Sequence, residues 1–96
     1  MPSSKEAQLR PLRDKIDVID KQIHECLQKR AALARDIAKV KEAHANGDVN
    51  YHCPEREEAV LEKIAALPSG AMPEAMLLEI FQHILKSCRR IQENKR

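Results

Sequence analysis

The stretch from Leu12 to Val40, which reads LRDKIDVIDKQIHECLQKRAALARDIAKV, decides the fold. Apolar side chains recur in it at alternating steps of four and three residues, and a cysteine and an arginine occupy two of the same positions. The full series, called the heptad seam below, is Leu12, Ile16, Ile19, Ile23, Cys26, Arg30, Leu33, Ile37 and Val40. This spacing is typical of a helix that packs along its whole length against another helix. We therefore expect a long helix, at residues 10–44.

Pro11 determines where this helix is expected to begin. Proline fits the first turn of a helix, where its missing N–H has no partner to lose, but it removes a hydrogen bond further in. Ser3 and Glu6 have the spacing of a capping box, although Pro11 would then lie inside the helix. We therefore expect residues 1–9 to form a frayed tail.

Two shorter helices are expected after the first. Asn46-Gly47-Asp48 is typical of a turn, so residues 45–53 should be a loop. Pro54 should begin a second helix at 54–67 and Pro73 a third at 73–93. Aromatic residues make up only 2% of the chain and there are two glycines, a composition that favours helices over strands. The sequence thus predicts one all-α domain over residues 1–96.

The length of the first helix predicts a dimer. A helix of about 35 residues spans about 50 Å, and two shorter helices cannot cover an apolar seam of that length. A chain of 96 residues also buries only a modest core by itself. We expect two copies to pair through the first helix in an intertwined helical homodimer.

Charge and cysteine usage exclude several functions. A net charge of +2 argues against a nucleic-acid partner, and no apolar run approaches the roughly 18 residues of a membrane span. The N-terminus lacks the apolar core of a signal peptide, and three scattered cysteines indicate reduced thiols, so we expect a cytoplasmic protein. No histidine or cysteine pair has zinc-ligand spacing, so neither a metal nor another cofactor is expected.

Polar residues interrupt the apolar faces at a few positions. Arg30 occupies a seam position, where an unpaired buried arginine is costly, so it should face a carboxylate or an anionic ligand. Lys41 lies eleven residues later, within about 20° of the same direction on a helix. Arg56 and Glu57 fall in the first turn of the second helix, and Gln92 borders the apolar face of the third. Taken alone, each also has a purely structural explanation: an ion pair for Arg30, a side chain that extends to solvent for Lys41, a capped surface helix for Arg56 and Glu57, and the edge of the core for Gln92.

Taken together, the positions resemble the all-helical class of chorismate mutases. The resemblance rests on Arg30 and Lys41 and on three segments, LRDKIDVID at 12–20, PERE at 54–57 and SCRRIQ at 87–92. It covers residues 9–92, nearly the whole chain. The resemblance implies a homodimeric isomerase that rearranges chorismate to prephenate, in the shikimate pathway to the aromatic amino acids, without metal or cofactor.

The resemblance also implies roles for single residues. Arg13 would reach a substrate carboxylate from the partner subunit, whereas Arg30 and Arg56 would hold carboxylates from the main subunit. Lys41 and Gln92 would hydrogen-bond the ether oxygen of the breaking C–O bond and, with Arg30, form the catalytic set. The remaining lining residues would be Glu57, which takes the ring hydroxyl, with Cys53 and Cys88, which stand where the family often has aspartate and serine.

The spacing along the first helix is consistent with a site shared between two copies. Arg13 and Arg30 are about 25 Å apart on one helix, too far to touch one small ligand. If two first helices pair antiparallel about a twofold axis near residue 24, Arg13 of one copy lies level with residue 35 of the other, between Arg30 and Lys41.

Two other functions remain open at this point. An isochorismate pyruvate-lyase on the same scaffold would use the same cationic pocket, but would release pyruvate. A non-catalytic dimerisation or regulatory module would leave chorismate unchanged.

Overall fold

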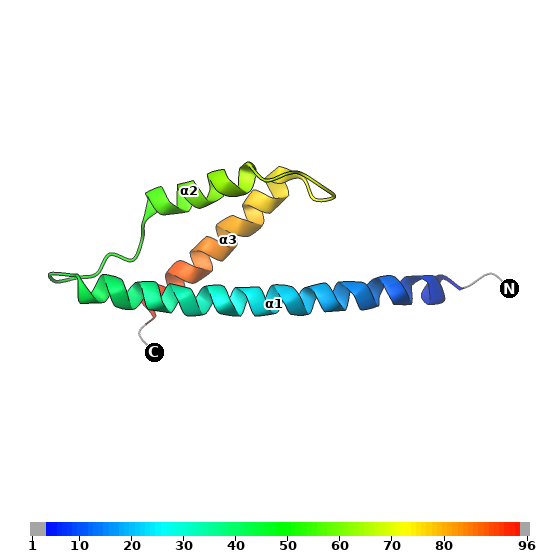
Figure 1. Ribbon diagram of the computed structural model, residues 1–96, viewed down its shortest axis with the longest axis horizontal. Coiled ribbons are helices and arrows are strands. Elements are labelled where there is room, and N and C mark those ends of the chain that lie inside the picture. Colours follow the sequence, from blue (N-terminus) through cyan, green and yellow to red (C-terminus); the bar gives the residue numbers. More distant parts are fainter. Residues whose placement is uncertain (1–3, 95–96) are drawn as a thin grey trace. The chain divides into compact units, whose positions relative to one another are not determined.

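The computed structural model describes residues 4–94, which form three α-helices and, within that range, no strand. The helices are α1 (Lys5–Ala43), α2 (Pro54–Ala65) and α3 (Glu74–Glu93) (Figure 1). The prediction of an all-α chain with a long, a short and a medium helix is confirmed. Among the described residues, no helix combines the length and the apolar character needed to cross a membrane. The chain divides into two units, residues 1–30 and 31–96, which are described in turn.

The first unit consists of the N-terminal part of α1. The helix begins at Lys5, five residues earlier than predicted, and Pro11 lies inside it. The Ser4 hydroxyl accepts the backbone N–H of Ala7 at 3.1 Å and so caps the helix. This cap, together with six good helix formers at residues 5–10, offsets the hydrogen bond that Pro11 cannot donate. The prediction of a frayed tail is therefore wrong for residues 5–9, and residues 1–3 lie outside the described range.

The heptad seam stays largely uncovered in the single chain. Its aliphatic side chains belong to both units, and their exposed fractions run from 49% for Ile37 to 61% for Leu33. Cys26 is also exposed, and Arg30 is half-buried. Large aliphatic side chains at regular helical spacing are normally covered in a folded protein, so the seam is an unpartnered face.

The second unit contains the end of α1 together with α2 and α3. Its buried side chains among the described residues are Ala34 and Ala38 on α1, and Leu85 and Cys88 on α3. The two alanines are one turn apart on α1. In Figure 1, α3 runs from the end of α2 back to the C-terminal part of α1. This return of the chain brings polar residues of α3 to one of α1 and to one of α2.

Prolines lie at the beginnings of both shorter helices and shortly after the end of α2. α2 ends at Ala65, two residues before the predicted end, because the ring of Pro68 disfavours a helical conformation at Leu67. Pro73 has an extended backbone (φ −61°, ψ 149°) and caps α3, which therefore begins at Glu74 and not at Pro73. In the loop before α2, Gly47 has φ +120°, a conformation that residues with a side chain rarely adopt.

Candidate functional site

Lys41 and Gln92, which are 51 positions apart in the sequence, meet in the second unit. The Lys41 ammonium donates to the side-chain oxygen of Gln92 at 3.1 Å and to the backbone oxygen of Tyr51 at 2.8 Å. Lys41 lies near the end of α1, Gln92 near the end of α3, and Tyr51 in the loop that leads to α2. Both side chains are half-buried. The ammonium group therefore joins two helices and a loop at one point.

This contact determines the orientation of the Gln92 amide. An ammonium group only donates hydrogen bonds, so the atom that faces Lys41 must be the amide oxygen. The NH2 group of Gln92 consequently points away from Lys41 as a donor. Lys41 has three N–H donors, and its two hydrogen bonds leave a third. The pair thus offers an ammonium donor and an amide donor side by side.

The loop before α2 is also tied to α1 by the side chain of Tyr51. The Tyr51 hydroxyl donates to a carboxylate oxygen of Glu42 at 2.6 Å. This hydrogen bond to the carboxylate raises the pKa of Tyr51 above its usual value, because ionising the phenol would place two negative charges in contact. The loop is therefore attached to the last turn of α1 at two points, next to Lys41.

A second polar cluster surrounds Glu57 in the first turns of α2. Arg89 of α3 donates to the two carboxylate oxygens of Glu57 at 3.1 and 3.4 Å. The imidazole of His52 lies 3.5 Å from the nearer of these oxygens. Both partners of the ion pair are partly buried, with 25% of the Arg89 side chain and 27% of the Glu57 side chain exposed. Glu57 is thus held between the loop and α3.

The structure places the other predicted site residues as follows. Arg56 and Cys53 are exposed, Arg56 in the first turn of α2 and Cys53 directly before that helix. Cys88 is buried on α3. Arg13 and Arg30 belong to the first unit, where Arg13 is exposed and pairs with Glu6 at 2.9 Å. The second unit therefore brings Lys41 and Gln92 into contact. It also contains the other four predicted residues: Arg56 and Glu57 lie on α2, Cys53 directly before α2, and Cys88 on α3.

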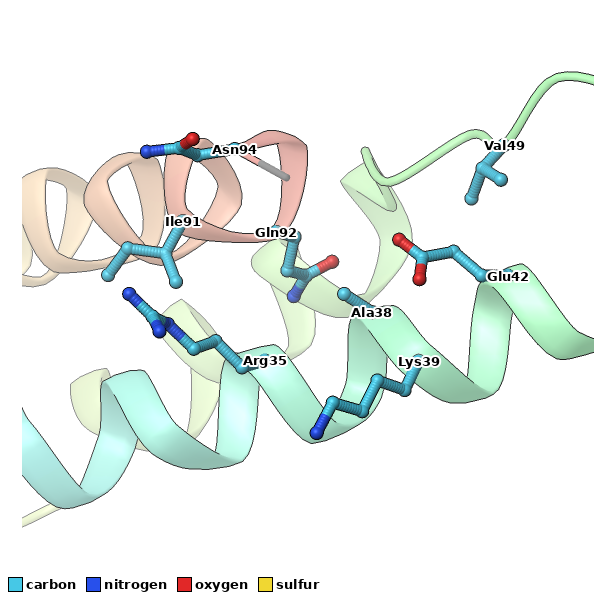
Figure 2. A pocket seen from close by; sticks show the side chains of 8 residues that line it. All are labelled: Arg35, Ala38, Lys39, Glu42, Val49, Ile91, Gln92 and Asn94. Atoms are coloured by element: carbon cyan, nitrogen blue, oxygen red, sulfur yellow. The ribbon is translucent and has the colours of Figure 1, made fainter. Parts of the chain in front are cut away.

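A pocket of about 550 Å³ opens beside the Lys41–Gln92 pair. Figure 2 shows the Gln92 side chain above Ala38, with Arg35 and Lys39 on the neighbouring turns of α1. The residues that line the pocket are Arg35, Ala38, Lys39, Glu42, Val49, Ile91, Gln92 and Asn94. Of these, only Gln92 was predicted as a site residue. Lys41 is not part of this lining, but it donates a hydrogen bond to Gln92, which is.

Sequence reasoning missed three residues that touch the predicted site. Arg89 lies four residues after Leu85, which is buried, so its place one turn further along the same face was a usable signal. His52 is next to Cys53 and was considered only as a metal ligand. Tyr51 contacts Lys41 through its main-chain oxygen, which any residue type supplies, so no signal for that contact exists in the sequence.

Comparisons with known proteins show the family to which the chain belongs. Residues 12–93 match the family described as chorismate mutase type II. A bifunctional chorismate mutase/prephenate dehydratase from Aquifex aeolicus is 35% identical over 85 residues, which are 84% of this chain and 23% of that protein. The protein of the same name from Pseudomonas aeruginosa is 33% identical over 88 residues, 90% of this chain and 24% of that protein. The chain thus spans about a quarter of the length of these curated relatives.

Two solved structures share the fold. The crystal structure of chorismate mutase from Helicobacter pylori in complex with prephenate has a TM-score of 0.78 and 28% sequence identity, covering 91% of both chains. The structure of chorismate mutase from Thermus thermophilus has a TM-score of 0.84 and covers 92% of this chain and 97% of the other, at 23% identity. At that identity, the second comparison concerns the fold alone.

Proposed function

Because the chain belongs to the chorismate mutase type II family, it is a chorismate mutase domain, and we propose that it converts chorismate to prephenate with the residues described above. The observation that carries the proposal is the 3.1 Å hydrogen bond between Lys41 and Gln92. These two residues were predicted to act on the same ether oxygen, and they meet although 51 positions separate them. The product places the reaction in the biosynthesis of the aromatic amino acids.

The proposed mechanism uses positioning and electrostatics only. The rearrangement breaks a C–O bond and forms a C–C bond within one molecule, so it requires neither a nucleophile nor a base. Catalysis then consists of holding the folded conformer of the substrate and stabilising the negative charge that develops on the ether oxygen. The third N–H of Lys41 and the NH2 group of Gln92 are the two donors that we assign to this oxygen.

We assign the substrate's two carboxylates to arginines. Guanidinium groups bind carboxylates through two parallel hydrogen bonds, which also fix the orientation of the ligand. Arg30 and Arg56 would act from one subunit, and Arg13 from its partner. Glu57 would accept the ring hydroxyl, and Cys53 and Cys88 would line the site without chemical roles.

We also propose that the working form is a homodimer. The heptad seam supports this, since its aliphatic side chains are about half exposed or more in the single chain. A second antiparallel copy would cover the seam along the whole of α1 and bring Arg13 to the partner's site. Each dimer would then hold two equivalent sites.

The proposal is tested with the purified chain and chorismate. We expect the ultraviolet absorbance of chorismate to disappear and prephenate to be the product. Release of pyruvate would instead show the lyase reaction, and unchanged chorismate would indicate a non-catalytic module. An Arg56→Ala variant should have a lower kcat/KM, which corresponds to a loss of roughly 2–5 kcal/mol in transition-state binding. A Lys63→Ala variant of the same helix serves as the control.

A further inference from the structure

Arg89 on α3 has no role in the proposed mechanism, although it is bound to Glu57, which has one. Its guanidinium contacts both oxygens of Glu57, at 3.1 and 3.4 Å, and lies 4.0 Å from the carboxylate of Glu93 one turn further along α3. Only a quarter of the Arg89 side chain is exposed. Two carboxylates therefore fix the guanidinium, one on its own helix and one on α2.

We infer that Arg89 is a positioning residue, which holds the Glu57 carboxylate in the orientation that accepts the ring hydroxyl of the substrate. This inference rests on the proposed function, because it requires that Glu57 meets that hydroxyl. Without a partner, a glutamate side chain in the first turns of a helix rotates about three bonds and has no single orientation. The ion pair with α3 removes that freedom before the substrate arrives.

The two oxygens of Glu57 are held unequally. The shorter contact of Arg89 and the imidazole of His52 both fall on Oε2, at 3.1 and 3.5 Å, whereas Oε1 has only the longer contact of 3.4 Å. A carboxylate has about four lone-pair positions, so Oε1 retains the capacity to accept a strong hydrogen bond. The geometry therefore assigns Oε1 to the substrate hydroxyl and Oε2 to the protein.

A positioning role for Arg89 differs from a merely structural role in what it changes. A merely structural ion pair would stabilise the contact of α2 with α3 equally, but would not change how the enzyme distinguishes substrates by their hydroxyl group.

That difference gives the test. The value of kcat/KM is measured for chorismate and for an analogue that lacks the ring hydroxyl, in the parent and in Arg89→Gln. We expect kcat/KM for chorismate to fall about tenfold or more, since misplacing one recognition group is costly, and the value for the analogue to change less than about twofold. The ratio of the two values should fall toward that of Glu57→Gln. Adding Arg89→Gln to Glu57→Gln should then have little further effect.

Two further variants complete the design. Arg90→Gln removes the exposed neighbouring arginine and should leave both values unchanged. Arg89→Lys keeps the charge but replaces the planar guanidinium by an ammonium on a more flexible stem, so its ratio should lie between those of the parent and Arg89→Gln, and it serves if Arg89→Gln does not fold. An active parent whose Arg89 variants keep the parental ratio would overturn this inference alone. A parent that leaves chorismate unchanged would overturn the proposed function and this inference with it.

Discussion

The two units of the chain differ in how much of their own apolar surface they bury. In residues 5–30, no side chain is buried, and the seam positions Leu12, Ile16, Ile19 and Ile23 are all more than half exposed. In residues 31–94, α1 and α3 each contribute two buried side chains, and the contacts around Lys41 and Glu57 are formed within the chain. The difference teaches that one chain brings Lys41 and Gln92 together by itself, whereas Arg13 lies on a part of α1 whose apolar seam the single chain leaves uncovered.

The largest expected effect comes from breaking the first unit's seam. Ile23→Asp places a carboxylate near the proposed twofold axis, where the two copies would bury a pair of like charges. We expect sedimentation to show loss of the dimer at micromolar concentration, and activity to fall below about 1% of the parent. Lys21→Asp introduces the same side chain off the seam and is the control. A dimeric, active Ile23→Asp protein would show that the seam is not the interface.

The next largest effect is expected from the second unit. Lys41→Ala removes the ammonium group that we assign to the ether oxygen, and also the donor that orients the Gln92 amide. We expect a loss of roughly 3–5 kcal/mol of transition-state stabilisation in kcat/KM, by analogy with donors in oxyanion sites. The dimer should persist, because Lys41 is not a seam residue. Near-normal turnover by a folded Lys41→Ala protein would remove Lys41 from the mechanism.

A pH-dependent effect is expected at the partner of Lys41. Gln92→Glu replaces a neutral amide donor by a group that donates only when it is protonated, and whose ionised form repels a developing negative oxygen. We therefore expect weak activity at neutral pH that recovers as the pH falls, while the parent changes little over the same range. Steady-state rates across the pH range measure this. Parental activity with a flat profile would mean that Gln92 does not contact the reacting oxygen.

The smallest effect is expected at Tyr51. Tyr51→Phe keeps the backbone oxygen that binds Lys41 but loses the hydrogen bond to Glu42, so kcat should fall only about two- to fivefold. Because the pKa of Tyr51 is higher in the folded chain than the usual tyrosine value of 10.0, the hydrogen bond stabilises the fold fully at pH values below 10.0. This stabilisation is lost as the pH rises through the pKa that Tyr51 has in the folded chain. Denaturant midpoints of the parent and the variant should therefore differ at about pH 8 and converge above about pH 10. A difference that does not shrink would contradict the assigned cause.

The sequence predicted the helices better than it predicted the contacts between them. The heptad seam predicted α1 because apolar spacing is a local property, but Pro11 misled us about its beginning, since the capping hydroxyl of Ser4 was not weighed against it. The meeting of Lys41 with Gln92 followed from the family resemblance and not from spacing, because no local pattern relates positions on α1 and α3. For Arg89, its place one turn after Leu85 was a local signal of partial burial, but nothing local identified its partner Glu57, which lies on another helix.

The central claim, that each site combines Lys41 of one copy with Arg13 of the other, has a direct test. Arg13→Ala and Lys41→Ala chains, each nearly inactive alone, are mixed, unfolded and reassembled, and the heterodimer fraction is measured by mass. Random pairing makes half of the dimers heterodimers, and each of these would hold one intact site of two, so the account predicts about a quarter of the parental activity. If both residues instead acted from the same chain, every site would lack one of them, and a mixture that contains heterodimers but stays inactive would contradict the account.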